Sequence, residues 1–326
     1  MKHIPSLASF ILIGTSSVFA GSPLEKELIQ KSINLLAKAS NGHIEKKSCF
    51  ACHNQAIPLI AFSQAISAGF NVSESDLKKQ EEFILEFLKT NHQKYLDGKG
   101  TGGDADTAGW VLWSLENTKT KPNELTNAVV KYLINFQAGS GYWKTTSNRP
   151  PSEASYFTTN YLVLRALRIW SPPSFLKEFH ERKSKVKEWV KQTPPKDHED
   201  SVFRLLCLHE LEAEPCEIKS ICKEILKKQK PNGGWSQMAD MEPDAYATGT
   251  TLVGLHLVGQ FDKNDQHIQK GLKFLEDTRI EDGSWLVKSR SKPFQPYYET
   301  GFPHGKDQFI SVTASAWATT ALILGQ

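Results

Sequence analysis

The feature that most constrains the fold is a short motif that recurs between segments of helical character. Q-x-x-x-G-x-W occupies residues 137–143 and 229–235, and residues 279–285 repeat it with Arg in place of Gln. Each copy follows a charged amphipathic segment and precedes a segment rich in small and apolar residues. The first kind of segment predicts a helix with one solvent-facing side, and the second predicts a helix buried on most sides. The chain is therefore built from helix pairs that repeat about every 46 to 50 residues.

Six such pairs can be traced, although only two carry the full motif and a third carries its Arg variant. The outer, charged helices are expected at residues 24–39, 76–90, 124–137, 176–191, 217–229 and 266–278. The inner, apolar helices are expected at residues 55–68, 106–115, 155–167, 201–211, 246–258 and 311–324. No strand pattern and no Pro- or Ser-rich linker interrupts them. The prediction is an all-α single domain over residues 21–326, an α6/α6 toroid with its outer-to-inner loops on one face.

The loop of the first pair carries Cys49-Phe50-Ala51-Cys52-His53, within residues 48–55. C-x-x-C-H is the attachment motif of a c-type haem, because the two thiols form thioethers and the histidine ligates the iron. A redox pair or disulfide, or half of a zinc site, would also suit two cysteines at this spacing. We expect one covalent haem c, attached at Cys49 and Cys52 and ligated by His53, at the mouth of the toroid. The other cysteines, Cys207, Cys216 and Cys222, are expected to be buried or free thiols. The alternative is a pair between Cys216 and Cys222, which would leave one thiol over.

The N-terminus predicts export from the cytoplasm. Residues 1–20 have a short basic start, an apolar stretch and small residues before Gly21, as in a signal peptide. The alternative is an N-terminal membrane anchor, although the stretch is short and contains Pro5. No later segment is expected to form a stable membrane span. We expect a periplasmic or secreted protein that meets the haem-attachment machinery there, and a formal charge of +3 argues against nucleic acid as a partner.

The last outer-to-inner loop, from about Trp285 to Ile310, is expected to lie beside the haem motif, because the sixth repeat neighbours the first in a closed toroid. His304 is the candidate sixth iron ligand, so His53 and His304 form the predicted metal set. Arg290 is the candidate partner of a haem propionate. Competing candidates for the sixth ligand are His198, Met238 and Met241.

The repeated motif resembles that of the squalene–hopene cyclase and terpene cyclase family. The resemblance covers about residues 24–326 and implies a toroid with an apolar central cavity, in which Trp143, Trp235 and Trp285 are structural. The family's class II members protonate substrate with the middle Asp of Asp-x-Asp-Asp-Thr, and the nearest match is Asp104-Ala-Asp-Thr-Ala108. This match leaves Asp106 as a candidate acid or a helix cap. Asp244 is the other residue expected in a position to act as an acid in the cavity. Squalene cyclisation itself is not expected.

The chain also resembles a bacterial group of secreted single-toroid proteins that carry C-x-x-C-H near the N-terminus. The match lies in residues 48–55 with Pro58, and in residues 282–308. Three functions remain open. The first is a haem protein that transfers electrons to a redox partner or does redox chemistry on a ligand at the barrel mouth. The second is a terpenoid-cyclase-like enzyme, and the third is a non-catalytic module that binds a small apolar ligand or a partner. Whether the chain is an enzyme is left undecided.

Overall fold

The computed structural model describes residues 21–137, 139–292 and 295–326, so the predicted signal peptide at 1–20 lies outside the described residues. Twelve α-helices and no named strand are found within these ranges. The outer helices are α1 (Pro23–Lys46), α3 (Glu74–Leu96), α5 (Glu124–Phe136), α7 (Leu176–Gln192), α9 (Pro215–Leu226) and α11 (Gln266–Thr278). The inner helices are α2 (Ile57–Ser67), α4 (Asp104–Asn117), α6 (Tyr156–Trp170), α8 (His198–Glu210), α10 (Ala245–Leu257) and α12 (Gln308–Gly325).

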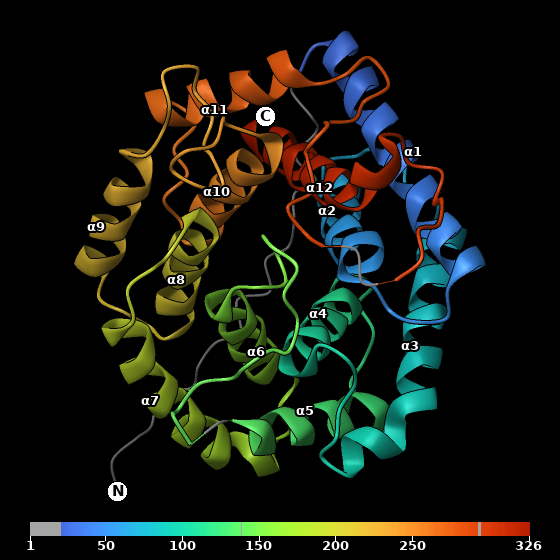
Figure 1. Ribbon diagram of the computed structural model, residues 1–326, viewed down its shortest axis with the longest axis vertical. Coiled ribbons are helices and arrows are strands. Elements are labelled where there is room, and N and C mark those ends of the chain that lie inside the picture. The colour runs from blue at the N-terminus through green and yellow to red at the C-terminus, as the bar shows by residue number, and fades with distance from the viewer. Residues whose placement is uncertain (1–20, 138, 293–294) are drawn as a thin grey trace, which may run out of the picture.

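The helices form two concentric rings (Figure 1). Each inner helix packs against the inner helices of the neighbouring repeats, and α12 contacts both α10 and α2. The last repeat therefore meets the first, and the ring is closed. This arrangement confirms the predicted α6/α6 toroid, with a core formed by the inner helices and the inward faces of the outer ones.

Helix starts follow local capping chemistry, so the predicted and observed boundaries mostly agree within a few residues. Asn123 and Thr126 form a capping box at the start of α5, and Ser155 and Asp244 cap α6 and α10. The largest difference is at α1, which continues to Lys46 instead of ending near residue 39. Ser40 and His43 are buried in this extension. A hydrophobic pattern does not reveal a helical turn whose inward residues are polar.

The recurring motif ties each outer helix to the turn that follows it. The indole N–H groups of Trp143, Trp235 and Trp285 donate to Leu133, Ile225 and Leu275 carbonyls at 2.7, 2.9 and 2.8 Å. Each acceptor lies ten residues earlier, near the end of an outer helix, where carbonyls lack intrahelical partners. The Gln137 and Gln229 amides donate to the carbonyls of Arg182 and His267 on the next outer helices. The structural role expected for these tryptophans agrees with these contacts.

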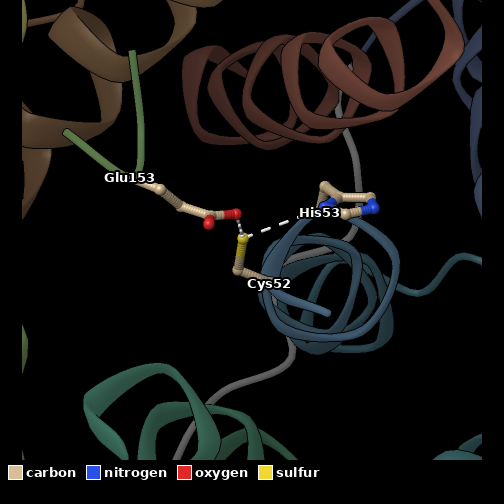
Figure 2. Close-up of side chains that lie close together, drawn as sticks. All are labelled: Cys52, His53 and Glu153. Carbon is tan, nitrogen blue, oxygen red and sulfur yellow. Dashed lines mark hydrogen bonds between the residues drawn. The ribbon is translucent and has the colours of Figure 1, made fainter. Parts of the chain in front are cut away.

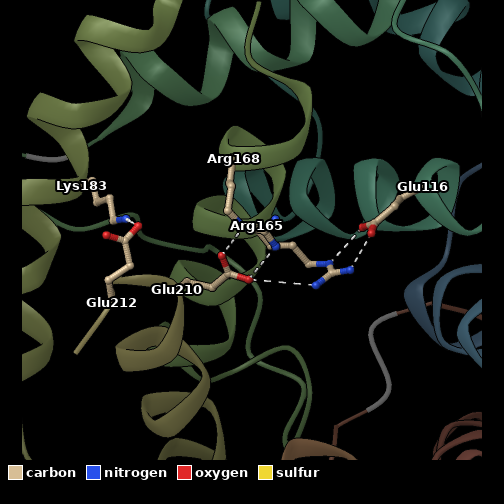
Figure 3. A network of polar contacts seen from close by, with 6 residues as sticks. All are labelled: Glu116, Arg165, Arg168, Lys183, Glu210 and Glu212. Atoms are coloured by element: carbon tan, nitrogen blue, oxygen red, sulfur yellow. Dashed lines mark hydrogen bonds and ion pairs between the residues drawn. The ribbon is translucent and has the colours of Figure 1, made fainter. Parts of the chain in front are cut away.

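Ion pairs connect the C-terminal ends of the inner helices (Figure 3). The Arg165 guanidinium donates twice to Glu116, and that of Arg168 donates twice to Glu210, so α4, α6 and α8 are linked in a row. Bidentate arginine–carboxylate pairs fix orientation as well as distance. This end of the ring lies away from the loops that carry the sequence motifs.

One described helix, the segment Gly305–Gly325 that includes α12, is long and apolar enough to cross a membrane by length and composition. The sequence predicts no segment after the N-terminus that is long and apolar enough to span a membrane, and α12 differs from this prediction. Because 83% of its apolar window is buried inside the protein, α12 serves as a core helix of the toroid.

Candidate functional site

The C-x-x-C-H motif lies where the first outer helix passes into the first inner helix, as the repeat pattern predicts. Residues Cys52–Ala56 form a π-helical turn that leads directly into α2. A cavity of about 690 Å³ opens beside this turn. The loops of repeats one, two, three and six line it, through residues such as Cys49, Gly102, Ser147 and Gln295. The motif therefore occupies the mouth of the toroid.

Cys49 and Cys52 both line the cavity, and neither is joined in a disulfide. The Cys52 thiol donates to Glu153 Oε1 at 2.5 Å (Figure 2). The Glu153 carboxylate also pairs with the Arg149 guanidinium. Burial raises the pKa of the Cys52 thiol to about 12, so this thiol is protonated at neutral pH. Cys207, Cys216 and Cys222 are also free thiols and do not line the cavity.

His53 offers a buried ring nitrogen with no hydrogen-bond partner among the described residues. Its Nε2 makes no hydrogen bond, while its Nδ1 lies 4.0 Å from Cys52 Sγ. The ring packs edge-on against Phe309 of α12, with centroids 5.0 Å apart. Burial lowers the pKa of His53 well below its usual value, which keeps the imidazole neutral. A neutral imidazole nitrogen without a hydrogen bond has a lone pair available to a metal.

A further histidine, missed by the sequence reasoning, supports the motif. His43 Nε2 lies 2.8 Å from the Cys49 carbonyl oxygen, and its Nδ1 lies 2.8 Å from the Tyr298 hydroxyl. The His43 and His53 rings are 6.3 Å apart in an edge arrangement. His43 lies in the part of α1 that the hydrophobic pattern did not predict, so no sequence signal pointed to it.

The predicted iron ligands other than His53 do not reach this cavity. His304 Nε2 contacts Ser284 Oγ at 2.8 Å, and His304 is absent from the residues that line the cavity. His198 is buried in α8, where its Nε2 contacts Thr251 at 2.6 Å. Met238 and Met241 also lie away from the lining, and Met238 is exposed. The structure therefore does not bring a second predicted ligand to His53, whereas Arg290 does line the cavity.

The two predicted acids differ in their surroundings. Asp244 caps α10, because its Oδ1 accepts from the Ala247 N–H. Asp106 was expected to be a helix cap as well, but α4 begins two residues earlier, with Gly103 in the capping position. Asp106 instead projects from the first turn into the cavity wall, where its carboxylate accepts from Thr159 Oγ1. Burial raises the pKa of Asp106 to about 7.

A second buried carboxyl, Glu199, lies near Asp106 and was also missed. It accepts hydrogen bonds from the hydroxyls of Thr158 and Tyr246. Burial raises the pKa of Glu199 to about 8, so this group is largely protonated at neutral pH. Its position in the first turn of an apolar helix gave no sequence signal beyond an ordinary acidic N-terminus.

The likeness of this chain to known proteins lies in its fold. No protein-family model matches it. It is similar to the apo type II terpene cyclase MstE from Scytonema, with 14% identity, a TM-score of 0.56 and coverage of 91% of this chain and 98% of that one. It is also similar to ent-copalyl diphosphate synthase from Streptomyces platensis, with 17% identity, a TM-score of 0.52 and coverage of 84% and 50%.

Two further matches show how widely this fold is shared. A possible member of the GH105 family from Salmonella enterica is 13% identical, with a TM-score of 0.55 and coverage of 92% of both chains. Lanosterol synthase ERG7 from Saccharomyces cerevisiae is 28% identical over 102 residues, which are 31% of this chain and 13% of that protein. These likenesses establish a terpene-cyclase-like toroid. They do not choose the chemistry, because one fold serves many functions.

Proposed function

We propose that this chain is an exported redox protein that holds one covalent c-type haem in the cavity of a terpene-cyclase-like toroid. One observation carries the proposal: Cys49, Cys52 and His53 line the same cavity, and the buried Nε2 of His53 has no partner in the part of the chain that the structure describes. When bound, the haem iron supplies one-electron chemistry toward a partner protein or a ligand at the barrel mouth.

The residues present fit such a group. The cavity of about 690 Å³ lies within the range of cofactor sites. Glu153 is the present partner of the Cys52 thiol, and it also pairs with Arg149. A thioether at Cys52 would therefore leave the Glu153 carboxylate with its cationic partner. His43 would hold the Cys49 carbonyl in place through the contact that it already makes.

The test is a pyridine haemochrome spectrum of denatured protein that was exported in the presence of haem-attachment machinery. We expect a covalently retained c-type band that Cys52→Ala reduces strongly. Cys222→Ala is the matched control, because Cys222 is a buried thiol outside the cavity, and it should keep the band. If correctly exported protein shows no such band, the haem proposal is wrong.

Acid-catalysed isoprenoid cyclisation is a second candidate, and the likeness to terpene cyclases supports it more directly than it supports the haem. The specific observation is Asp106, whose buried carboxyl lines the cavity and has its pKa raised to about 7. A carboxyl that keeps its proton near neutrality can act as a general acid. The test is formation of a cyclised product from a linear isoprenoid by protein without haem. The product should be lost in Asp106→Asn and kept in Asp104→Asn.

A further inference from the structure

The cavity at the toroid mouth contains buried hydrogen-bond donors that no described residue satisfies. In the described structure Trp110 Nε1 and Arg290 Nε are buried, lack partners and belong to residues that line this cavity. Among the described lining residues, no buried side-chain oxygen is left unpaired in the same way. A buried donor without an acceptor is costly, so unpaired donors in a native cavity call for an explanation. A ligand that brings acceptor oxygens supplies one.

Charge in the cavity favours an anionic ligand. Arg149, Arg290 and Lys292 line it, against the two carboxyls of Asp106 and Glu153. Glu153 already pairs with Arg149, and the raised pKa of Asp106 leaves that carboxyl partly protonated at pH 7.

The other charged and titratable neighbours do not reverse this balance. Burial lowers the pKa of both His43 and His53, so neither adds charge of its own. Arg290 also attracts Asp197 and Asp244, and this attraction lowers the pKa of each, against the larger raising effect of burial. No ion pair within 4.0 Å joins Arg290 to either acid in the described structure, so its guanidinium keeps capacity for a ligand.

The walls of the cavity are aromatic. The Trp110 ring stacks on Trp113 with an interplanar angle of 7° and centroids 5.4 Å apart. The Phe50 and Phe87 rings, which also line the cavity, lie 5.9 Å apart. Such walls suit an extended or flat apolar body, whereas the unpaired donors suit its polar end.

We infer that this cavity binds an apolar ligand through a carboxylate, with Arg290 and Trp110 as the groups that recognise it. The ligand chemistry has two possible sources, the propionates of a porphyrin or the carboxylate of an isoprenoid acid. The inference concerns the cavity of the proposed haem, but it does not require thioether attachment.

The test uses the mature chain with Cys49→Ser and Cys52→Ser, so that no covalent haem occupies the cavity. Binding of metal-free protoporphyrin IX is compared with binding of its dimethyl ester, and binding of farnesoic acid with that of its methyl ester. For each probe that binds, we expect the affinity of the acid to exceed that of its ester by about tenfold or more. The reason is that a charge-assisted hydrogen bond contributes more than a neutral one. The pair that shows this preference identifies the source of the carboxylate.

Two variants assign the preference to the named residues, and circular dichroism checks that each folds. Arg290→Gln should remove most of the preference for the acid, while Lys263→Gln, an exposed charge outside the cavity, should leave it unchanged. Trp110→Phe keeps an aromatic ring, although a smaller one, and removes the N–H, and it should weaken binding of the acid several-fold. Its control is Trp170→Phe, because the buried Trp170 Nε1 is also unpaired but lies away from the cavity.

The result that overturns the inference is equal binding of acid and ester, a preference that survives both Arg290→Gln and Trp110→Phe, or no binding of any probe. Failure of the haem proposal is separate. A missing haemochrome band together with a preserved acid preference would remove covalent haem and leave carboxylate recognition in place.

Discussion

At the scale of single residues, the protein keeps two carboxyls in surroundings that favour their neutral form. Asp106 and Glu199 are each buried and accept hydrogen bonds from neutral hydroxyls. Their pKa values are raised to about 7 and about 8 by burial, the largest cause in both cases. These two groups make the stability of the protein depend on pH near neutrality.

For Asp106 the sign of that dependence follows from its two pKa values. The unfolded chain releases this proton near pH 4, whereas the folded chain keeps it until about pH 7. Asp106 therefore favours folding most at low pH, and its contribution is lost as the pH rises through that window. Relative to Asp106→Asn, the free energy of unfolding of the unmodified protein should fall by about 2–3 kcal/mol between pH 5 and pH 8. Urea titrations at both pH values measure this difference, and parallel pH profiles for the two proteins would contradict it.

At the scale of helices and turns, the repeated motif works as a connector between neighbouring outer helices. Its glycine occurs with a positive φ in all three copies, for example 91° at Gly233. The turn at Gly233 also passes close to the next outer helix. A Cβ atom on Gly233 would lie 2.3 Å from the Lys270 carbonyl oxygen. Glycine is required there by both conformation and space.

Gly233→Ala and Gly259→Ala separate these two requirements. Gly259 also has a positive φ, of 68°, but its surroundings are open. Gly259→Ala should cost about 1 kcal/mol of folding free energy, from backbone conformation alone. Gly233→Ala should cost about 1–3 kcal/mol more, because the backbone of α11 has to move. Thermal and urea unfolding of both variants give the comparison, and equal losses would show that the close approach is unimportant.

At the scale of the whole molecule, stability depends on a seam between the first and last repeats. Ser32 Oγ of α1 donates to the Gly283 carbonyl at 2.5 Å, and the Gln326 side chain donates to Glu25 at 2.7 Å. Gly42 of α1 lies so close to the last loop that a Cβ atom would be 2.1 Å from the Thr300 carbonyl oxygen. The seam closes the ring and seats the loop that carries Arg290 and Tyr298.

Gly42→Ala tests the seam. Alanine favours helix over glycine by about 1 kcal/mol, so a destabilised variant would report the clash with Thr300 rather than helix propensity. We expect a lower melting temperature and faster tryptic cleavage at Lys288 and Arg290 in the last loop. Gly139→Ala, where the space is open, should change neither measurement. An unchanged cleavage rate in Gly42→Ala would show that the loop does not depend on this contact.

The sequence by itself determined the number of helix pairs, their inner or outer place, and the position of Cys49, Cys52 and His53 at the mouth. These are properties of periodicity and repeat order, which local residues encode. Asp106 was found through its motif, although its role as a cap was wrong because α4 begins earlier than predicted. Capping depends on the exact first residue of a helix, which a hydrophobic pattern does not give.

Only the tertiary structure decided which side chains surround the motif. Arg149, His43 and Trp110 reach the cavity from three different repeats, and their separation in sequence hides their proximity. His304 was expected beside His53, but it contacts Ser284 within its own repeat. The physical reason is that the path of a long loop is fixed by the contacts that it makes along the seam between the first and last repeats. Repeat order brings the loop to the right neighbourhood, whereas those contacts determine which of its residues face the cavity.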